Sequence, residues 1–421
     1  MIQSRGTETA LTDHSKIMDH LLELPASTMV TTGRTGTDFL QSLLDSHPEV
    51  LTFNGPIFFQ EFWAHSACVT AGAFDTRDLI DEFIGKHIER FKSRYDLMER
   101  KHQLGDESNQ SLDIDLDLFR AEATNFLEGR EASSKVVLMA IYAAYATCLG
   151  QDLSEKTLFF HHAHHFGQLP QFFQDFPESK IICMTRDPRA NFVSGVEHHR
   201  ANNFLIGDTD QGAHVTFYIK RILEDASPLQ GHTGRYMAIR LEDLGDPEII
   251  EELCRWLGIK NNEVTSRSTW GGLAWQGDRL STVGTGGKFS SAVLVNSWET
   301  RLSFTDKYVL NYIMNNRLKH YGYRHRRITP LDTLLVPLLI LLPLRFEWRF
   351  LSFSYIRTAL RRKEIKKLIQ NWLAYVSRVG LFLKFYSKVA RMQKFAHPLL
   401  AVPTSKMVSD QDTQNNEQAD V

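Results

Sequence analysis

The chain has 421 residues, of which 43% are apolar, so it can bury a large core and exceeds the usual size of one compact domain. Its four cysteines form no Cys-X-X-Cys pair, which argues against a zinc site or a disulfide framework. Its polar N-terminus lacks the apolar stretch of a signal peptide. Both features indicate a cytoplasmic setting. The net charge of −2 is unevenly spread: residues 324–394 carry 16 Lys and Arg against 3 Asp and Glu, a net of +13, which predicts an anionic partner for that segment, either a membrane or a nucleic acid.

The first elements of the chain form a unit that commonly holds phosphate groups. We expect residues 1–27 to be a flexible leader with one short helix. Residues 28–32 (TMVTT) are a short β-branched run typical of a buried strand. A Gly/Thr turn over residues 33–38 follows, and apolar side chains at helical spacing then continue until Pro48. A strand, a glycine loop and a helix in this order can present backbone amides to an anion.

Over residues 72–130, charged and apolar residues alternate with a helical period, which predicts a helical insertion. Insertions after the first crossover often shape a substrate cleft, so this segment either recognises an acceptor or forms a solvated helical pair.

The middle of the chain alternates strands with helices. Residues 135–149 are apolar and predict a buried helix, and strands are expected at residues 157–160, 180–185 and 236–241, the last followed by a loop and an amphipathic helix. This pattern predicts an α/β fold: a mainly parallel sheet with helices on both faces. Ligands are expected at the carboxyl ends of its strands.

Two of these strands are followed by residues suited to bind phosphate. In the loop over residues 33–37, Arg34 adds a permanent charge to the backbone amides and the helix N-terminus. The loop does not fit the Walker A pattern, because no Lys-Ser/Thr follows its last glycine. After the strand at residues 180–185, Arg186 and Ser194 stand eight residues apart and can hold one phosphate together. Taken alone, the loop would be a plain turn and Arg186 a surface ion pair; the occurrence of both favours a nucleotide site.

These segments resemble the sulfotransferase family that uses 3'-phosphoadenosine 5'-phosphosulfate (PAPS). The stretch VTTGRTGTDFLQSLLDSHPEV resembles the family's 5'-phosphosulfate loop, IICMTRDPRANFVSG its 3'-phosphate motif, and RLEDLGDPEIIEELCRWLGI its later loop and helix. The resemblance covers residues 28–323 and implies a P-loop NTPase-like sulfotransferase fold. It implies that PAPS is the co-substrate and that no metal is required.

The resemblance also implies roles for individual residues. Arg34 takes the position of the basic residue that contacts the 5'-phosphosulfate and stabilises charge on the leaving phosphate. The remaining donor-binding positions are Thr35, Gly36, Thr37, Asp38, Phe39, Arg186, Ser194, Gly286, Gly287 and Lys288. Asp38 departs from the family pattern, which commonly has Thr or Ser there. A carboxylate at that position turns toward Arg34 or an acceptor group, or serves only as an acidic residue at the start of a helix.

A cluster of histidines, HHAHH, is expected just after the strand at residues 157–160, where the resemblance places the catalytic base. His164 aligns best with that base, followed by His162 and His165, and Glu61 is a further candidate because some members use a glutamate. The alternatives are a structural role for the histidines or a metal site, although no carboxylate or cysteine partner is near in sequence.

Residues 324–402 predict a basic amphipathic helical region that binds an anionic membrane, and residues 403–421 a disordered tail. The apolar run at residues 334–344 is too short to cross a bilayer. Its neighbours interleave aromatic residues and leucines with Arg and Lys, which is typical of interfacial helices. A basic helical pair packed on the catalytic domain is the alternative, and nucleic acid is disfavoured because phosphate contacts need few aromatics.

Together these features predict an enzyme attached peripherally to the inner face of a membrane. It would transfer a sulfuryl group from PAPS to a hydroxyl of a carbohydrate, glycolipid or other membrane-proximal acceptor, with a histidine or glutamate base. A catalytically inactive, membrane-attached binding protein is one alternative, which Asp38 supports. A P-loop nucleotide kinase is another, and the missing Lys-Ser/Thr argues against it.

Overall fold

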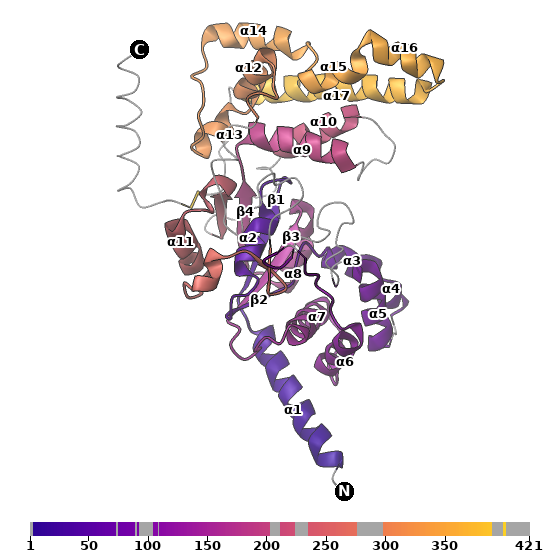
Figure 1. The fold of residues 1–421 in the computed structure, drawn as a ribbon, viewed down its shortest axis with the longest axis vertical. Coiled ribbons are helices and arrows are strands. Elements are labelled where there is room, and N and C mark those ends of the chain that lie inside the picture. Colours follow the sequence, from indigo (N-terminus) through magenta and orange to yellow (C-terminus); the bar gives the residue numbers. More distant parts are fainter. Residues whose placement is uncertain are drawn as a thin grey trace.

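Five parallel strands form the central sheet, in the order β2-β3-β1-β4-β5 (Figure 1). The computed structural model describes residues 3–72, 75–88, 91, 104–107, 109–202, 211–223, 235–275, 298–389 and 399–400. The strands are β1 (Ala26–Thr31), β2 (Val50–Thr52), β3 (Leu158–His164), β4 (Lys180–Thr185) and β5 (Tyr236–Arg240). A two-stranded antiparallel ribbon of β6 (Thr269–Trp270) and β7 (Leu273–Ala274) lies outside this sheet. The predicted α/β class with a parallel sheet is therefore confirmed.

Two strands differ from their sequence-based predictions. β2 was not predicted, because its three residues are too few to show a period. β3 was expected to end before the histidines, but it continues through His164, so residues 161–164 belong to the strand itself. This part of the prediction was wrong because His is uncommon in strands, and only the pairing with β1 shows that the extended backbone continues.

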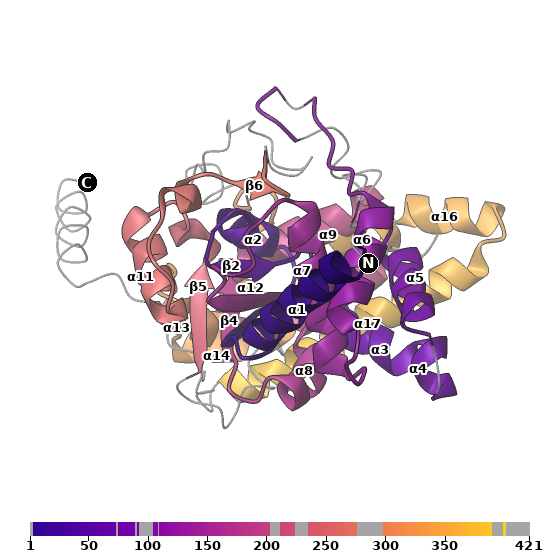
Figure 2. The same cartoon turned by 90° about the horizontal axis from the view of Figure 1, so that it is seen from below.

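Helices cover both faces of the sheet (Figure 2). One face packs on α2 (Thr37–Leu44) and α11 (Pro247–Leu257), whose apolar residues share a core with Met29 and Ile182. The other face packs on α7 (Ser134–Cys148) and α8 (Leu169–Asp175), with Phe159 in the same core. Short 3-10 helices connect elements at η2 (Phe166–Gln168), η4 (Leu241–Asp243) and η5 (Glu263–Ser266).

The segment before β1 contains a longer helix than the short one we expected. α1 spans Gln3–Leu22, and its last turns bury Met18 and Leu21 completely in the core formed with α6 and α7. An apolar residue every third or fourth position near the end of the helix explains why it packs against the domain.

The inserted segment also joins this core. Its helices are α5 (Thr76–His87) and α6 (Leu116–Leu127), next to α3 (Phe59–His65) and α4 (Ala67–Ala71). Phe83, Phe119 and Phe126 are at most 2% exposed and pack toward α7 and α3. The insertion is therefore part of the folded domain; part of it lies outside the described residues.

A helical layer lies beyond the sheet and carries the basic C-terminal segment. α9 (Pro188–Asn202) and α10 (Gln211–Leu223) lie between the sheet and the last helices of the chain (Figure 1). Those helices are α12 (Phe304–Ile313), α13 (Asn315–His320), α14 (Pro330–Ile340), α15 (Arg345–Leu351), α16 (Phe353–Arg361) and α17 (Ile365–Val389). Val336, Ile340 and Phe382 are fully buried in one core with Phe192 and Ile219, so the C-terminal helices share their packing with α9 and α10.

A buried ion pair ties the C-terminal helices together. Arg378 is 0% exposed and bonds Glu347 through two contacts, Nη2 to Oε2 at 2.6 Å and Nε to Oε1 at 3.0 Å. Its guanidinium also donates to the carbonyls of Ile340 and Leu342. This single side chain therefore connects α17 with α15 and with the end of α14. Among the described residues, no helix is both long and apolar enough to cross a membrane.

Candidate active site

The loop after β1 has a backbone shaped to surround an anion. Gly33, Arg34 and Gly36 have φ values of +91°, +56° and +84°, and the Gly33 amide donates to the Thr31 hydroxyl at 2.8 Å. A Cβ at Gly36 would overlap the side chain of Leu241, so only glycine fits there. Left-handed residues in succession turn neighbouring amides toward one centre, and α2 begins directly after them.

Thr35 and Thr37 stabilise this loop from inside. The Thr35 side chain is 0% exposed, and its hydroxyl bonds the hydroxyl of Thr31, which closes the turn. Thr37 is the first residue of α2 and is also buried, whereas Arg34 and Phe39 are partly exposed. The Thr32 hydroxyl accepts from Asn191 of α9 at 2.8 Å, which connects the loop with the helix that carries Ser194.

The structure brings the two predicted arginines together. Arg186 follows β4 and is 8% exposed; burial lowers its pKa, the carboxylate of Glu242 raises it, and the neighbouring charge of Arg34 lowers it. Within the described structure its Nε has no hydrogen-bond partner. Glu242 offsets part of the cost of burying Arg186, but the unused Nε donor and the second guanidinium leave room for a further anion, so this pair fits a phosphate-bearing ligand.

A network of polar contacts holds the turn after β4. The Asp187 amide donates to Glu242 Oε1 at 3.0 Å, and Tyr323 donates to Glu242 Oε2 at 2.9 Å. Arg189 bonds the Asp187 carboxylate through Nη2 at 2.6 Å and Nε at 3.0 Å. Ser194 lies about two turns into α9, as the sequence predicts, and the structure shows it partly buried. The segment with Gly286, Gly287 and Lys288 lies outside the described residues.

The histidines of β3 divide between the two sides of the strand. His161 is 0% exposed, its Nδ1 lies 2.8 Å from the Tyr142 hydroxyl, and burial lowers its pKa to about 3. On the other side, His162 Nε2 lies 3.2 Å from His164 Nδ1. A bulge opposite residues 28–30 interrupts the pairing of β3 with β1, and His164, the last residue of the strand, has a left-handed φ of +63°. His162 and His164 therefore lie together on one side of β3, and His161 lies in the core on the other side.

Charged groups around His164 determine its acidity. Burial, His162, His165 and Arg221 lower its pKa well below the usual value, and the carboxylate of Asp38 raises it. Asp38, the residue that departs from the family pattern, therefore affects the pKa of a histidine in the candidate site. A neutral His164 can accept a proton. Glu61 lies on the exposed side of α3.

Arg221 of α10 is a site residue that the sequence did not reveal. Its Nη2 donates to His165 Nδ1 at 3.0 Å, and a Cβ at Gly33 would lie 3.5 Å from its Nη1. The His165 ring stacks on Phe58 with 5.3 Å between centroids, and burial lowers the pKa of His165 to about 4. Arg221 could not be found from sequence, because α10 shows no phosphate-binding pattern and its contacts lie 56 and 188 positions away.

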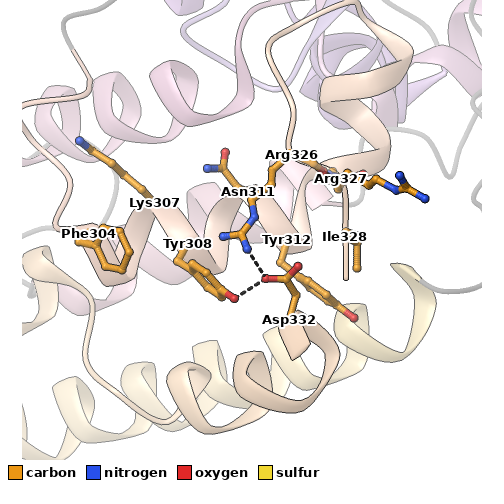
Figure 3. A pocket seen from close by; sticks show the side chains of 10 residues that line it. Phe304, Lys307, Tyr308, Asn311, Tyr312, Arg326, Arg327, Ile328 and Asp332 are labelled. Carbon is orange, nitrogen blue, oxygen red and sulfur yellow. Dashed lines mark hydrogen bonds and ion pairs between the residues drawn. The ribbon is translucent and has the colours of Figure 1, made fainter. Parts of the chain in front are cut away.

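A surface pocket lies between α12 and the start of α14 (Figure 3). Lys307, Arg326 and Arg327 contribute its basic groups, and Asp332 bonds both the Tyr308 hydroxyl and Arg326. Asn311 also lines the pocket and accepts from Arg189 at 2.7 Å, so the pocket borders the turn after β4. Among the described residues, no group of His, Cys, Asp or Glu is arranged to hold a metal ion.

The parallel sheet with helices on both faces, and a glycine loop between a strand and a helix, define a protein of the α/β class. Sequence comparison assigns this class to one family, because residues 28–263 match the sulfotransferase family over more than half of the chain. The chain therefore belongs to the sulfotransferase family. The predicted family membership is confirmed.

Several solved structures are similar at low identity. They include the sulfotransferase domain of the Synechococcus olefin synthase (18% identity over 66% of this chain and 88% of that one, TM-score 0.36). They also include the sulfotransferase domain of the curacin biosynthetic pathway (14%, 66% and 91%, 0.36) and sulfotransferase STF1 of Mycobacterium tuberculosis (16%, 61% and 73%, 0.34). No curated protein sequence matches the chain. At these TM-scores the superpositions are loose, and the family assignment is based on the sequence match.

Proposed function

We propose that the protein transfers a sulfuryl group from PAPS to a hydroxyl acceptor. The observation that carries this proposal is the buried Arg186 with its unused Nε beside Arg34, at the ends of two adjacent parallel strands. Two neighbouring arginines suit a donor that carries phosphate groups at both the 3' and the 5' position of its ribose. Arg186 and Ser194 would hold the 3'-phosphate, and Arg34 with the loop over residues 33–37 the 5'-phosphosulfate.

In the proposed reaction a histidine accepts the proton of the acceptor hydroxyl. The hydroxyl oxygen forms a bond to sulfur, and the bond between sulfur and the bridging phosphate oxygen breaks with its electron pair left on the phosphate. We expect Arg34 and Arg221 to stabilise that negative charge, because Arg34 belongs to the loop after β1 and Arg221 of α10 lies near Gly33 of the same loop. This chemistry needs only residues of the chain and the donor.

Binding measurements with two nucleotides test the donor site. Arg186→Ala should weaken 3'-phosphoadenosine 5'-phosphate by about 1.5–3 kcal/mol, the value of a hydrogen bond to a charged group, and adenosine 5'-phosphosulfate much less. Titration calorimetry measures both. Arg255→Ala is the control, because Arg255 is exposed on α11 and pairs with Glu251 and Glu252 of its own helix. Equal losses for both nucleotides in Arg186→Ala would show that Arg186 does not contact the 3'-phosphate.

The acceptor we propose is a hydroxyl of a carbohydrate, glycolipid or other molecule near a membrane. Contacts of the described part of the insertion of residues 72–130 support a role in shaping its cleft: Phe83 of α5 contacts Phe59 and Phe62 of α3, and Phe58 before α3 stacks on His165. Transfer of labelled sulfate from PAPS into lipid and polysaccharide extracts of the source cells tests this. Label in small aryl or steroid acceptors alone would contradict it, and no transfer at all would support an inactive binding protein.

We further propose that α14 to α17 attach the enzyme to an anionic membrane from the cytoplasmic side. Of the 18 exposed large apolar side chains in the described part of the chain, 15 lie in residues 331–383. Exposed Arg and Lys residues alternate with them, including Arg349, Arg361 and Lys363. Apolar groups that enter the interface, combined with basic groups for anionic headgroups, favour a lipid surface over a nucleic acid.

Vesicle sedimentation tests the membrane proposal. Trp372→Ser with Leu373→Ser on α17 removes two side chains that are 49% and 62% exposed, and should weaken binding to vesicles containing anionic lipid without lowering the thermal midpoint. Leu118→Ser on α6 is the matched control, since Leu118 is 41% exposed but far from this surface in sequence. Added salt should weaken binding of the unmodified protein. Unchanged sedimentation of the double variant would contradict this surface.

A further inference from the structure

Gln41 of α2 has an amide group whose orientation is determined by backbone neighbours. Its side chain is 0% exposed; Oε1 accepts from the Gly55 amide at 3.1 Å, and Nε2 donates to the carbonyl of Phe53. A backbone N–H can only donate and a carbonyl can only accept, so the two ends of the amide cannot be exchanged. His162 Nδ1 lies 2.9 Å from the same Oε1 and must therefore donate to it.

The position of the proton on His162 also determines the position of the proton on His164. A neutral imidazole with its proton on Nδ1 has an acceptor at Nε2. His162 Nε2 lies 3.2 Å from His164 Nδ1, so His164 must donate from Nδ1. His162 is fully buried, where a charged ring would be costly, so the neutral form applies. The remaining nitrogen of His164, Nε2, then carries the lone pair.

We propose that Gln41 and His162 are positioning residues that hold His164 in this tautomer, with Nε2 as the atom that accepts the acceptor's proton. The inference rests on the proposed sulfuryl transfer. It also separates the three candidate histidines. An arginine always donates, so Arg221 occupies the lone pair of His165 Nδ1, and a neutral His165 carries its proton on Nε2. His162 uses both nitrogens for Gln41 and His164.

Gln41 and His162 do not transfer a proton themselves. During transfer the acceptor O–H bond breaks and its hydrogen forms a bond to His164 Nε2, while the hydroxyl oxygen bonds to sulfur. The bond between sulfur and the bridging phosphate oxygen breaks, and its electron pair stays on the leaving phosphate. His164 becomes a cation whose Nδ1–H still donates to His162 Nε2. Asp38 favours that cation, whereas His162, His165 and Arg221 disfavour it; these four groups belong to α2, β3, the residue after β3 and α10.

Nitrogen-15 NMR of histidine-labelled protein tests the tautomer directly, without donor or turnover. At pH 7.5 the His164 ring, assigned through His164→Gln, should show a protonated Nδ1 and an unprotonated Nε2. The opposite pattern would overturn the inference even if the enzyme transfers sulfate. Conversely, the spectrum remains informative if no sulfate transfer is found, so failure of the inference and failure of the proposed function are distinguishable.

Two variants of His162 test the positioning role. His162→Gln has a side-chain oxygen that can accept from His164 Nδ1–H, and His162→Leu has none. We expect His162→Leu to lower kcat at least about tenfold with donor affinity unchanged, and His162→Gln to recover most of the activity. His161→Gln is the control, because His161 lies on the opposite side of the same strand. Equal losses in both His162 variants, or full activity in His162→Leu, would contradict the role. Gln41→Met should mix the tautomers of His162 in the same spectra.

Discussion

His164 shows at the residue scale how neighbouring charges prepare a side chain for proton transfer. Burial and the groups His162, His165 and Arg221 lower its pKa, so it is neutral near neutral pH. Asp38 acts in the opposite direction. A carboxylate beside the donor loop would repel phosphates, but near His164 it can stabilise the charge that forms during the reaction. The departure at Asp38 from the family pattern is therefore compatible with activity.

Opposite pH shifts are expected for two substitutions near His164. Asp38→Asn removes the group that raises the pKa of His164, so the acid limb of kcat/KM should move to lower pH. Arg221→Gln removes a cation that lowers this pKa, so the limb should move to higher pH. In the unmodified enzyme the limb should lie below about pH 6.5, the usual value for histidine. Initial rates between pH 4.5 and 8 measure the three profiles. Shifts of the same sign would exclude His164 as the titrating base.

At the scale of elements, α14 divides one apolar sequence between two environments. Val336 and Ile340 are 0% exposed and pack on α9, α10 and α12, whereas Leu334 and Leu338 are 71% and 62% exposed. The helix therefore both completes the core and presents leucines outward. Removal of residues after 323 would expose the buried faces of α9, α10 and α12, so we expect such a truncated chain to aggregate.

A pair of substitutions in α14 tests this division. Ile340→Ala should lower the free energy of unfolding by about 2–5 kcal/mol, because it leaves a cavity in the core shared with α10. Leu338→Ala, on the exposed side of the same helix, should change it by less than about 0.5 kcal/mol. Urea denaturation followed by fluorescence gives both values. Similar losses for the two variants would mean that both faces of α14 are packed.

For the whole molecule, buried neutral histidines link stability to pH. His161 has a folded-state pKa of about 3, below its usual value of about 6.5 in an unfolded chain. Below pH 6.5 the unfolded chain therefore binds a proton that the folded protein does not, and stability is lost as pH falls toward 3. Above pH 6.5 the contribution is complete, because both states are neutral.

The expected slope is about 1.4 kcal/mol per pH unit for one such histidine. His161→Gln removes this proton and should reduce the loss of stability between pH 6.5 and 5 by about 2 kcal/mol relative to the unmodified protein. Urea midpoints at matched pH values measure the difference. Parallel pH dependence in the two proteins would show that His161 is accessible to protons in the folded state.

Local pattern in the sequence was sufficient for much of the architecture and for the family. Short apolar or β-branched runs predicted four of the five strands, and the loop at residues 33–37 was recognisable because it lies between a predicted strand and a predicted helix. Arg34 and Arg186 could be identified because each directly follows such a strand. β2 was missed because three residues carry no period.

Only the tertiary structure decided which side chains meet. Gln41 reaches His162 across 121 positions, Arg221 reaches His165 across 56, and Phe192 shares a core with Ile340 of α14. Such contacts depend on how helices pack across the sheet, which neither spacing nor composition encodes. For the same reason the sequence showed a basic, apolar C-terminal segment but could not tell which of its leucines are buried and which face outward.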